Sequence, residues 1–221
     1  MIRKDEFEKK YPLKFKKYES VVSKLKQPPR TGWLQWNIEN PETVYEHIRA
    51  VRVMAGRYKD NLELTEEELL ELLDMIEIHD WPEALVGDGV ILGDEKDVDK
   101  LRAHKKAREL EAMITLCNAL EDGPYIMSLY QRYAEGKDKI ATLTKQIEKL
   151  QAVFKAVEYE NSLKKKGLTA EFVHYTKDLI HHPFLQTEMK IASSRLLSLF
   201  YIFSTVSSGL ISLLLVLNIY K

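Results

Sequence analysis

The chain has 221 residues, and its 33 Lys and Arg side chains almost balance its 34 Asp and Glu side chains, which gives a formal net charge of −1. This balance argues against a strongly basic protein that binds nucleic-acid polymers, and a hydrophobic content of 45% excludes a wholly disordered chain. The single cysteine, Cys117, excludes an intrachain disulfide and favours a reducing compartment.

The N-terminal residues are rich in lysine and carry an apolar residue at every third or fourth position, which predicts one amphipathic helix over residues 1–27. We expect this helix to pack on the domain that follows. Its basic face leaves a membrane-surface role as the alternative. The apolar positions are Phe7, Tyr11, Phe15, Tyr18 and Val22.

Residues 28–190 contain a series of helical apolar patterns, and none of these segments alternates as a strand would. Pro28 and Pro29 separate this region from the first helix. The sequence therefore predicts an all-α fold with one helical domain over residues 28–190. The expected helices span residues 41–58, 65–82, 99–119, 124–134, 137–159 and 169–180.

Residues 196–220 contain no charged side chain, and as a helix they would extend about 37 Å. That length is sufficient to cross a hydrocarbon core of about 30 Å. We expect a transmembrane C-terminal helix that anchors a cytoplasmic domain, because Lys190 and Arg195 precede it. The alternative is a buried C-terminal helix, since several Ser and Thr residues dilute its apolarity.

Three polar residues occupy positions that the apolar periodicity assigns to the protein interior. His47 lies on the apolar face of its helix, and His79 and Asp80 end the apolar face of the next one. A buried carboxylate needs a cation or strong hydrogen-bond donors. Two imidazoles and a carboxylate suit a divalent first-row metal ion, whereas core histidines with ordinary hydrogen-bond partners are the alternative.

With these residues in place, the sequence resembles the HD-domain metal-dependent phosphohydrolases, and specifically their small 5′-deoxynucleotidase group. The resemblance covers roughly residues 12–190. Its most specific part is an ordered set: a histidine, then HDxxE followed by GD, then KQIE before EYE. The motifs are PRTGW (29–33), NIENPETVYEH (37–47), IHDWPEALVGD (78–88), TKQIEKLQAVFKAVEYE (144–160) and HHP (181–183).

The resemblance implies four metal ligands, which fall on His47, His79, Asp80 and Glu148. The last is a departure, because the family has Asp at this position and Glu is one methylene longer. In a helix, Glu148 points away from the centre of the main apolar stripe and shares a face with small residues such as Ala141. An exposed glutamate on a solvated face is the alternative.

The resemblance also implies roles around the metal ion. Glu83 matches the residue that handles the attacking water or the leaving oxygen, and Asp88 matches a residue near the sugar. Arg30 and Trp33 match the region that contacts the phosphate and shapes the sugar pocket. An Arg side chain offers a bidentate fork to a phosphate, and an aromatic wall can exclude a 2′-hydroxyl. For Trp33, packing of its loop is the alternative.

By this resemblance, the protein is a metal-dependent hydrolase of nucleoside 5′-monophosphates, with deoxynucleotides preferred. The cofactor is a divalent ion, with Mn, Co, Mg and Zn not distinguished, and a homodimer is expected. Two alternatives remain open at this point. The first is an HD phosphohydrolase that acts on another nucleotide phosphoester. The second is a membrane-tethered nucleotide-binding or scaffold protein that retains the fold without turnover.

Overall fold

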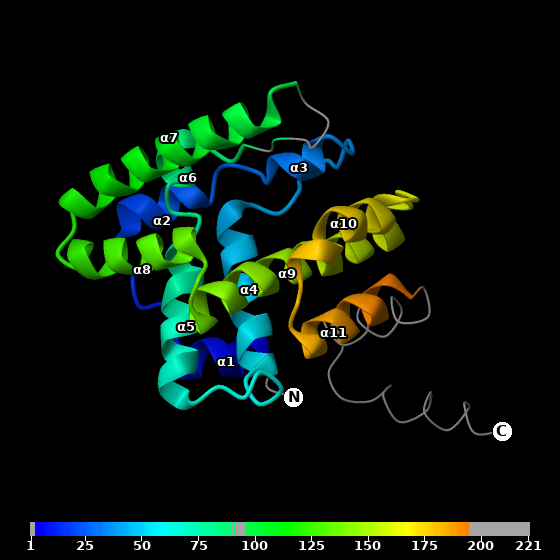
Figure 1. Cartoon of the computed structure of the whole chain (residues 1–221), viewed down its shortest axis with the longest axis horizontal. Helices are drawn as coiled ribbons and strands as arrows, with labels where there is room; N and C mark the ends of the chain where they lie inside the picture. The colour runs from blue at the N-terminus through cyan, green and yellow to red at the C-terminus, as the bar shows by residue number, and fades with distance from the viewer. Residues whose placement is uncertain (1–2, 90, 92–95, 195–221) are drawn as a thin grey trace. The chain divides into compact units, whose positions relative to one another are not determined.

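The computed structural model describes residues 3–89, 91 and 96–194. Within these residues the secondary structure is helical, with an isolated bridge between Pro29 and Thr43 and no strand, which confirms the all-α prediction (Figure 1). The elements are α1 (Lys4–Lys10), α2 (Glu19–Leu25), α3 (Thr31–Leu34), α4 (Val44–Tyr58), α5 (Glu66–Ile78), α6 (Glu83–Val86), α7 (Val98–Asn118), α8 (Gly123–Glu135), α9 (Lys139–Leu163), α10 (Leu168–Thr176), the 3-10 helix η1 (Lys177–Leu179) and α11 (Pro183–Ser193).

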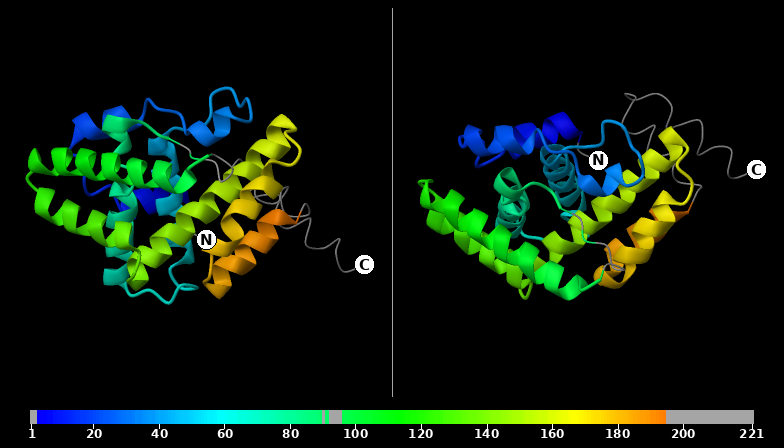
Figure 2. Two further views of the ribbon diagram at one scale, coloured as in Figure 1. Left: turned by 45° about the horizontal axis from the view of Figure 1, so that its top comes forward. Right: turned by 90° about the horizontal axis from the view of Figure 1, so that it is seen from above.

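The chain divides into two compact units, residues 1–151 and residues 152–221, with the boundary inside α9. In the first unit α4 packs against α5, and α1 packs against α4. Helices α7 and α8 form a second pair and lie side by side (Figure 2). All residues of the functional site described below belong to the first unit.

Helices α4 and α5 each begin with a capping box. Thr43 accepts a hydrogen bond from the Glu46 backbone N–H, and the Glu46 carboxylate accepts one from the Thr43 N–H. Thr65 and Glu68 repeat this arrangement at α5. These bonds satisfy N–H groups that a helix start leaves without partners. Fully buried apolar residues then join the two helices: Val44, Ile48, Val51, Leu69, Leu72, Leu73 and Ile76.

The prediction of one N-terminal helix over residues 1–27 is wrong. The segment forms two short helices, α1 and α2, because Pro12 lacks a backbone N–H and disfavours a helical conformation at Tyr11. The backbone of the interruption instead bonds to side chains of the core. The N–H groups of Lys14 and Phe15 each donate to the buried Glu77 carboxylate at 2.9 Å.

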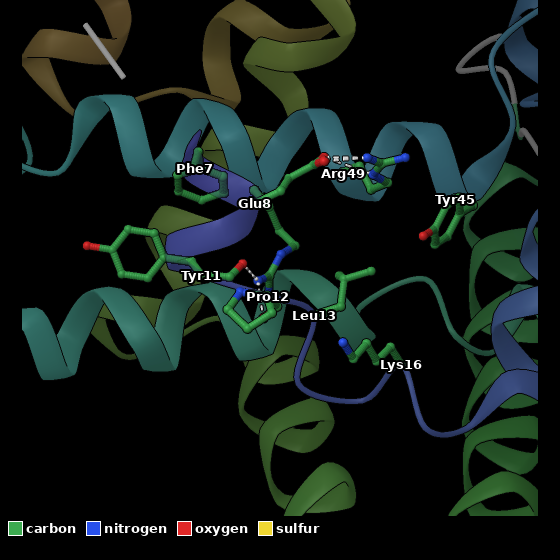
Figure 3. Close-up of a pocket in the computed structure, with 9 residues that line it drawn as sticks. Phe7, Glu8, Tyr11, Pro12, Leu13, Lys16, Tyr45 and Arg49 are labelled. Carbon is green, nitrogen blue, oxygen red and sulfur yellow. Dashed lines mark hydrogen bonds and ion pairs between the residues drawn. The ribbon is translucent and has the colours of Figure 1, made fainter. Parts of the chain in front are cut away.

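The apolar side of this N-terminal segment packs on α4, in agreement with the expectation that it packs on the domain. Phe7 is 1% exposed and lies so close to Gly56 that a Cβ atom there would stand 2.0 Å from the Phe7 ring. Glycine at position 56 therefore allows α1 to approach α4. Glu8 of α1 forms an ion pair with Arg49 of α4 at 2.6 Å, and both side chains line a pocket together with Tyr11 (Figure 3).

The second unit contains the end of α9, then α10, η1 and α11. Glu160 ties the end of α9 to the start of α10, because its carboxylate accepts hydrogen bonds from the backbone N–H groups of Gly167 and Thr169. Helices α10 and α11 pack against each other. Buried apolar residues in this unit include Leu168, Ile180, Leu185, Met189 and Ala192.

The hydrophobic segment 196–220, which the sequence predicts to be a transmembrane helix, lies outside the described residues. Among the helices that the structure does describe, none combines the length and the apolarity that crossing a membrane requires.

Candidate metal centre

Three side chains that the sequence assigned to the interior meet at one point. His47 comes from the first turns of α4, His79 is the C-cap residue of α5, and Asp80 follows it. One potential ligand atom from each lies within 4.8 Å of the others. His79 Nε2 is 3.2 Å from Asp80 Oδ2, and His47 Nε2 is 3.8 Å from the same oxygen. The two helices thus bring together the histidines and the carboxylate that the sequence predicted to be close.

Glu148 of α9 lies beside this cluster. Its Oε2 atom is 3.1 Å from His79 Nε2 and accepts a hydrogen bond from the Tyr133 hydroxyl at 2.8 Å. The side chain is buried, so the alternative of an exposed glutamate on a solvated face is wrong. The longer side chain of Glu therefore reaches the cluster from this position on α9.

The donor atoms fit a divalent metal ion. His79 Nδ1 donates to the Ile76 backbone carbonyl at 2.7 Å, which directs Nε2 toward the two carboxylates. This Nε2 atom is buried and has no well-aligned hydrogen-bond partner. Imidazole nitrogen and carboxylate oxygen are the donors that first-row divalent ions bind, and a fixed Nδ1–H is typical of histidine ligands.

Burial and neighbouring charges shift the pKa values of these groups in opposite directions. Burial, with help from the Arg30 cation, lowers the pKa of His47 to about 3. Burial alone would also lower the pKa of His79, but Asp80 and Glu148 outweigh it and raise that pKa to about 10. A proton on His79 therefore balances the carboxylates at neutral pH, and a bound cation would replace it.

Glu83, Arg30 and Asp88 surround the cluster. Glu83 is 6% exposed, and its Oε2 atom is buried without a hydrogen-bond partner. Burial, reinforced by the negative charges of Asp80 and Asp88, raises the pKa of Glu83 to about 10. The Arg30 guanidinium donates to Asp80 Oδ2 at 2.9 Å. Asp88 accepts hydrogen bonds from the backbone N–H and the hydroxyl of Thr31, which secures the loop that carries Arg30.

Trp33 packs in the protein core. Its side chain is 2% exposed, and its indole N–H donates to Glu42 Oε1 at 3.2 Å. This geometry matches the packing alternative that the sequence left open.

Sequence reasoning missed three polar residues near the centre. Tyr133 holds the Glu148 carboxylate, and the side-chain oxygen of Gln151 lies 2.6 Å from His47 Nδ1. Glu42 in turn accepts a hydrogen bond from the Gln151 amide at 3.2 Å. The available signal was the position of Gln151, one helical turn after Glu148 on α9.

Comparison with known proteins agrees with this geometry. Residues 22–187 match the HD domain family. The chain is 32% identical to the protein named 5′-deoxynucleotidase HDDC2 of Danio rerio, and the match covers 75% of this chain and 80% of that relative. It is also 32% identical to the protein of the same name from Dictyostelium discoideum, where the match covers 79% of this chain and 95% of that relative. Among solved structures, the PH0347 protein of Pyrococcus horikoshii OT3 has a similar fold, with a TM-score of 0.62 and 23% identity over 79% of this chain and 96% of that one.

The chain therefore belongs to the HD-domain family. Within that family its similarity to these relatives identifies it as a 5′-deoxynucleotidase-like hydrolase.

Proposed function

We propose that this protein is a metal-dependent phosphohydrolase that removes phosphate from nucleoside 5′-monophosphates and prefers deoxynucleotides. The observation that carries the proposal is the buried His79 Nε2 atom, which faces the carboxylates of Asp80 and Glu148 without a well-aligned hydrogen-bond partner. The likeness to proteins named 5′-deoxynucleotidase supports the substrate class.

His47, His79, Asp80 and Glu148 would hold the metal ion. When bound, a divalent ion supplies positive charge that polarises the phosphoryl group and activates a water molecule. The chain's own residues orient the substrate. Arg30, already 2.9 Å from Asp80, offers N–H donors to phosphate oxygens at the edge of the centre.

Glu83 would donate the proton that the leaving nucleoside needs. Its raised pKa keeps the carboxyl protonated at neutral pH, and its Oε2 atom makes no hydrogen bond that would have to be broken first. A protonated carboxyl can donate to the 5′-oxygen as the bond to phosphorus breaks, which is general acid catalysis.

Asp88 would contribute to sugar recognition. Its carboxylate accepts two hydrogen bonds from Thr31 and so has a fixed position beside the loop of Arg30. A carboxylate fixed there can accept a hydrogen bond from a sugar hydroxyl. We expect Asp88→Asn to weaken discrimination between nucleotides more than it weakens metal binding.

The proposal is tested with metal-depleted full-length protein. Mn²⁺, Co²⁺, Mg²⁺ or Zn²⁺ is added back, and phosphate release is measured from matched deoxyribo- and ribonucleoside 5′-monophosphates. Nucleoside 3′-monophosphates and the Asp80→Asn variant serve as controls. We expect metal-dependent release from the 5′-monophosphates, faster for the deoxy forms. Absence of release with every metal, or equal release by Asp80→Asn, contradicts the proposal. Release from another phosphoester alone redirects the substrate assignment.

A further inference from the structure

A chain of buried polar side chains leads to the metal centre from outside it. Trp33 of α3 donates to Glu42 Oε1, and the Gln151 nitrogen Nε2 donates to Glu42 Oε2, each at 3.2 Å. The Gln151 oxygen Oε1 lies 2.6 Å from His47 Nδ1. Each of the four side chains is no more than 7% exposed. Residues 33–47 and Gln151 of α9, which are far apart in the sequence, therefore meet at this hydrogen-bonded series.

The chemistry of these groups determines which one donates and which one accepts in each hydrogen bond of this series. An indole N–H only donates and a carboxylate only accepts, so Glu42 is the acceptor for both neighbours. Gln151 must therefore turn its NH₂ group toward Glu42 and its carbonyl oxygen toward His47. Because a carbonyl oxygen only accepts, the hydrogen of a neutral His47 imidazole must lie on Nδ1. Nε2 is then left with its lone pair on the side of Asp80.

We propose that Glu42 and Gln151 are positioning residues that set the tautomer of His47, so that Nε2 is ready to bind a metal ion before one arrives. His79 needs no such pair, because the Ile76 backbone carbonyl fixes its Nδ1–H. A backbone carbonyl thus orients His79, whereas side chains orient His47. The side chains that orient His47 can be changed by substitution. This inference rests on the proposed function only in taking His47 as a metal ligand.

The tautomer is measured directly in ¹⁵N-labelled, metal-free full-length protein. Two-bond ¹H–¹⁵N correlation spectra distinguish Nδ1–H from Nε2–H imidazoles, and the His47→Asn variant assigns the His47 signals. We expect the Nδ1–H form in the wild-type protein. The Nε2–H form would overturn the proposal, and this test needs no substitution at Glu42 or Gln151.

Two variants then test the cause. Glu42→Gln keeps the size of the side chain and an acceptor for Trp33, but it allows the Gln151 amide to turn over. Gln151→Leu removes the partner of His47. We expect both variants to mix the two His47 tautomers and to lower Mn²⁺ affinity by roughly 10- to 100-fold, the usual effect of losing such a partner. Thr144→Val is the matched control on α9, because the buried Thr144 hydroxyl donates to the Ile140 carbonyl of its own helix. We expect it to leave both readouts unchanged.

The outcomes separate this inference from the proposed function. If both variants keep the wild-type tautomer and Mn²⁺ affinity, the positioning role is contradicted. If the tautomer and the affinity shift while wild-type protein releases no phosphate from any nucleotide, the positioning role stands and the phosphohydrolase proposal fails. Thermal unfolding of each variant shows whether the substitution destabilises the whole protein. If it does, the test of the proposal is the His47 tautomer in the wild-type spectrum.

Discussion

Helices α4 and α5 carry two buried polar clusters that differ in how their groups are paired. We call the first the N-terminal junction: Arg52 of α4, Glu77 of α5 and the backbone of residues 11–15. The second is the metal centre around His47 and His79. In the junction Glu77 accepts two backbone N–H groups and pairs with Arg52 at 3.2 Å. Arg52 also donates to the backbone carbonyls of Tyr11, Pro12 and Leu73.

The metal centre leaves buried atoms without such partners. His79 Nε2 and Glu83 Oε2 make no well-aligned hydrogen bond, although each lies inside the protein. A buried polar atom without a hydrogen-bond partner costs about 1–3 kcal/mol, so the Glu83 carboxyl does not stabilise the fold. The paired cluster therefore holds the structure together, whereas the incompletely paired one has donor atoms that could hold a metal ion.

Substitution of Asp80 is expected to have the largest effect on function. Asp80→Asn keeps the size of the side chain but removes the negative charge that lies close to His79, His47 and Arg30. We expect metal affinity to fall by more than the roughly 100-fold that loss of an outer partner costs, with phosphate release lost as well. Because the substitution leaves the Arg30 guanidinium without its carboxylate, we expect the metal-free protein to lose some stability in thermal unfolding as well. Unchanged metal affinity in calorimetric titration would contradict the assignment of Asp80 as a ligand.

Glu83→Gln should separate chemistry from metal binding. It retains a polar side chain of the same size but cannot supply the carboxyl proton. We expect kcat to fall by about 10²- to 10⁴-fold, the usual contribution of a general acid. Mn²⁺ affinity, measured by calorimetric titration, should stay at the wild-type value. A parallel fall in Mn²⁺ affinity would show that Glu83 acts through the metal site.

Glu77→Leu tests the other cluster. It leaves the Arg52 guanidinium buried without its carboxylate, and we expect the free energy of unfolding to fall by about 3–5 kcal/mol in urea titrations. The matched control is Arg49→Ala, which breaks the half-exposed ion pair with Glu8 and should cost at most about 1 kcal/mol. Equal effects of the two substitutions would contradict the assignment of the junction as a structural cluster.

Tyr133→Phe removes the hydroxyl that holds Glu148 Oε2. Because Tyr133 would hold the Glu148 ligand in place without binding the metal ion itself, we expect metal affinity to fall by roughly 10- to 100-fold. The related variant Tyr130→Phe, on the same helix α8, should have a smaller effect. Calorimetric titration with Mn²⁺ compares the two. Unchanged affinity in Tyr133→Phe would mean that Glu148 is held without this hydrogen bond.

Gly56→Ala is expected to have the smallest effect and to spare the metal centre. The added methyl group would meet the Phe7 ring, so α1 must shift on α4. We expect a loss of about 1–3 kcal/mol in the free energy of unfolding, as for overpacked cores, reduced by the better helix propensity of Ala. Metal affinity should not change. A stabilised variant would show that α1 is not packed here as described.

The predictability of each feature depended on whether its signal was local. Helical spacing was sufficient to place His47 and His79 inside, and Asp80 followed from its position beside His79. Spacing alone left Glu148 ambiguous, because the burial of a polar helix face depends on what packs against it. The resemblance to a family supplied that assignment, and the short distance between Glu148 and His79 agrees with it.

Features that depend on several distant segments could not be predicted. The contact between Gln151 and Glu42 joins residues 109 positions apart, and neither has a periodic signal. The N-terminal error was different in kind. The apolar spacing continues on both sides of Pro12 as it would in one helix, but proline has no backbone N–H for a helical hydrogen bond. The interruption is stable because Glu77 and Arg52 replace the lost helical hydrogen bonds.

We propose above that the incompletely paired cluster is a metal site that serves phosphate-ester hydrolysis. The most direct test is a calorimetric titration of Mn²⁺ into metal-depleted full-length protein, with dAMP hydrolysis measured at each point of the titration. We predict one ion bound per chain and hydrolysis that rises in proportion to the bound metal. Absence of binding, or hydrolysis that proceeds equally well in the metal-depleted protein, would contradict the claim.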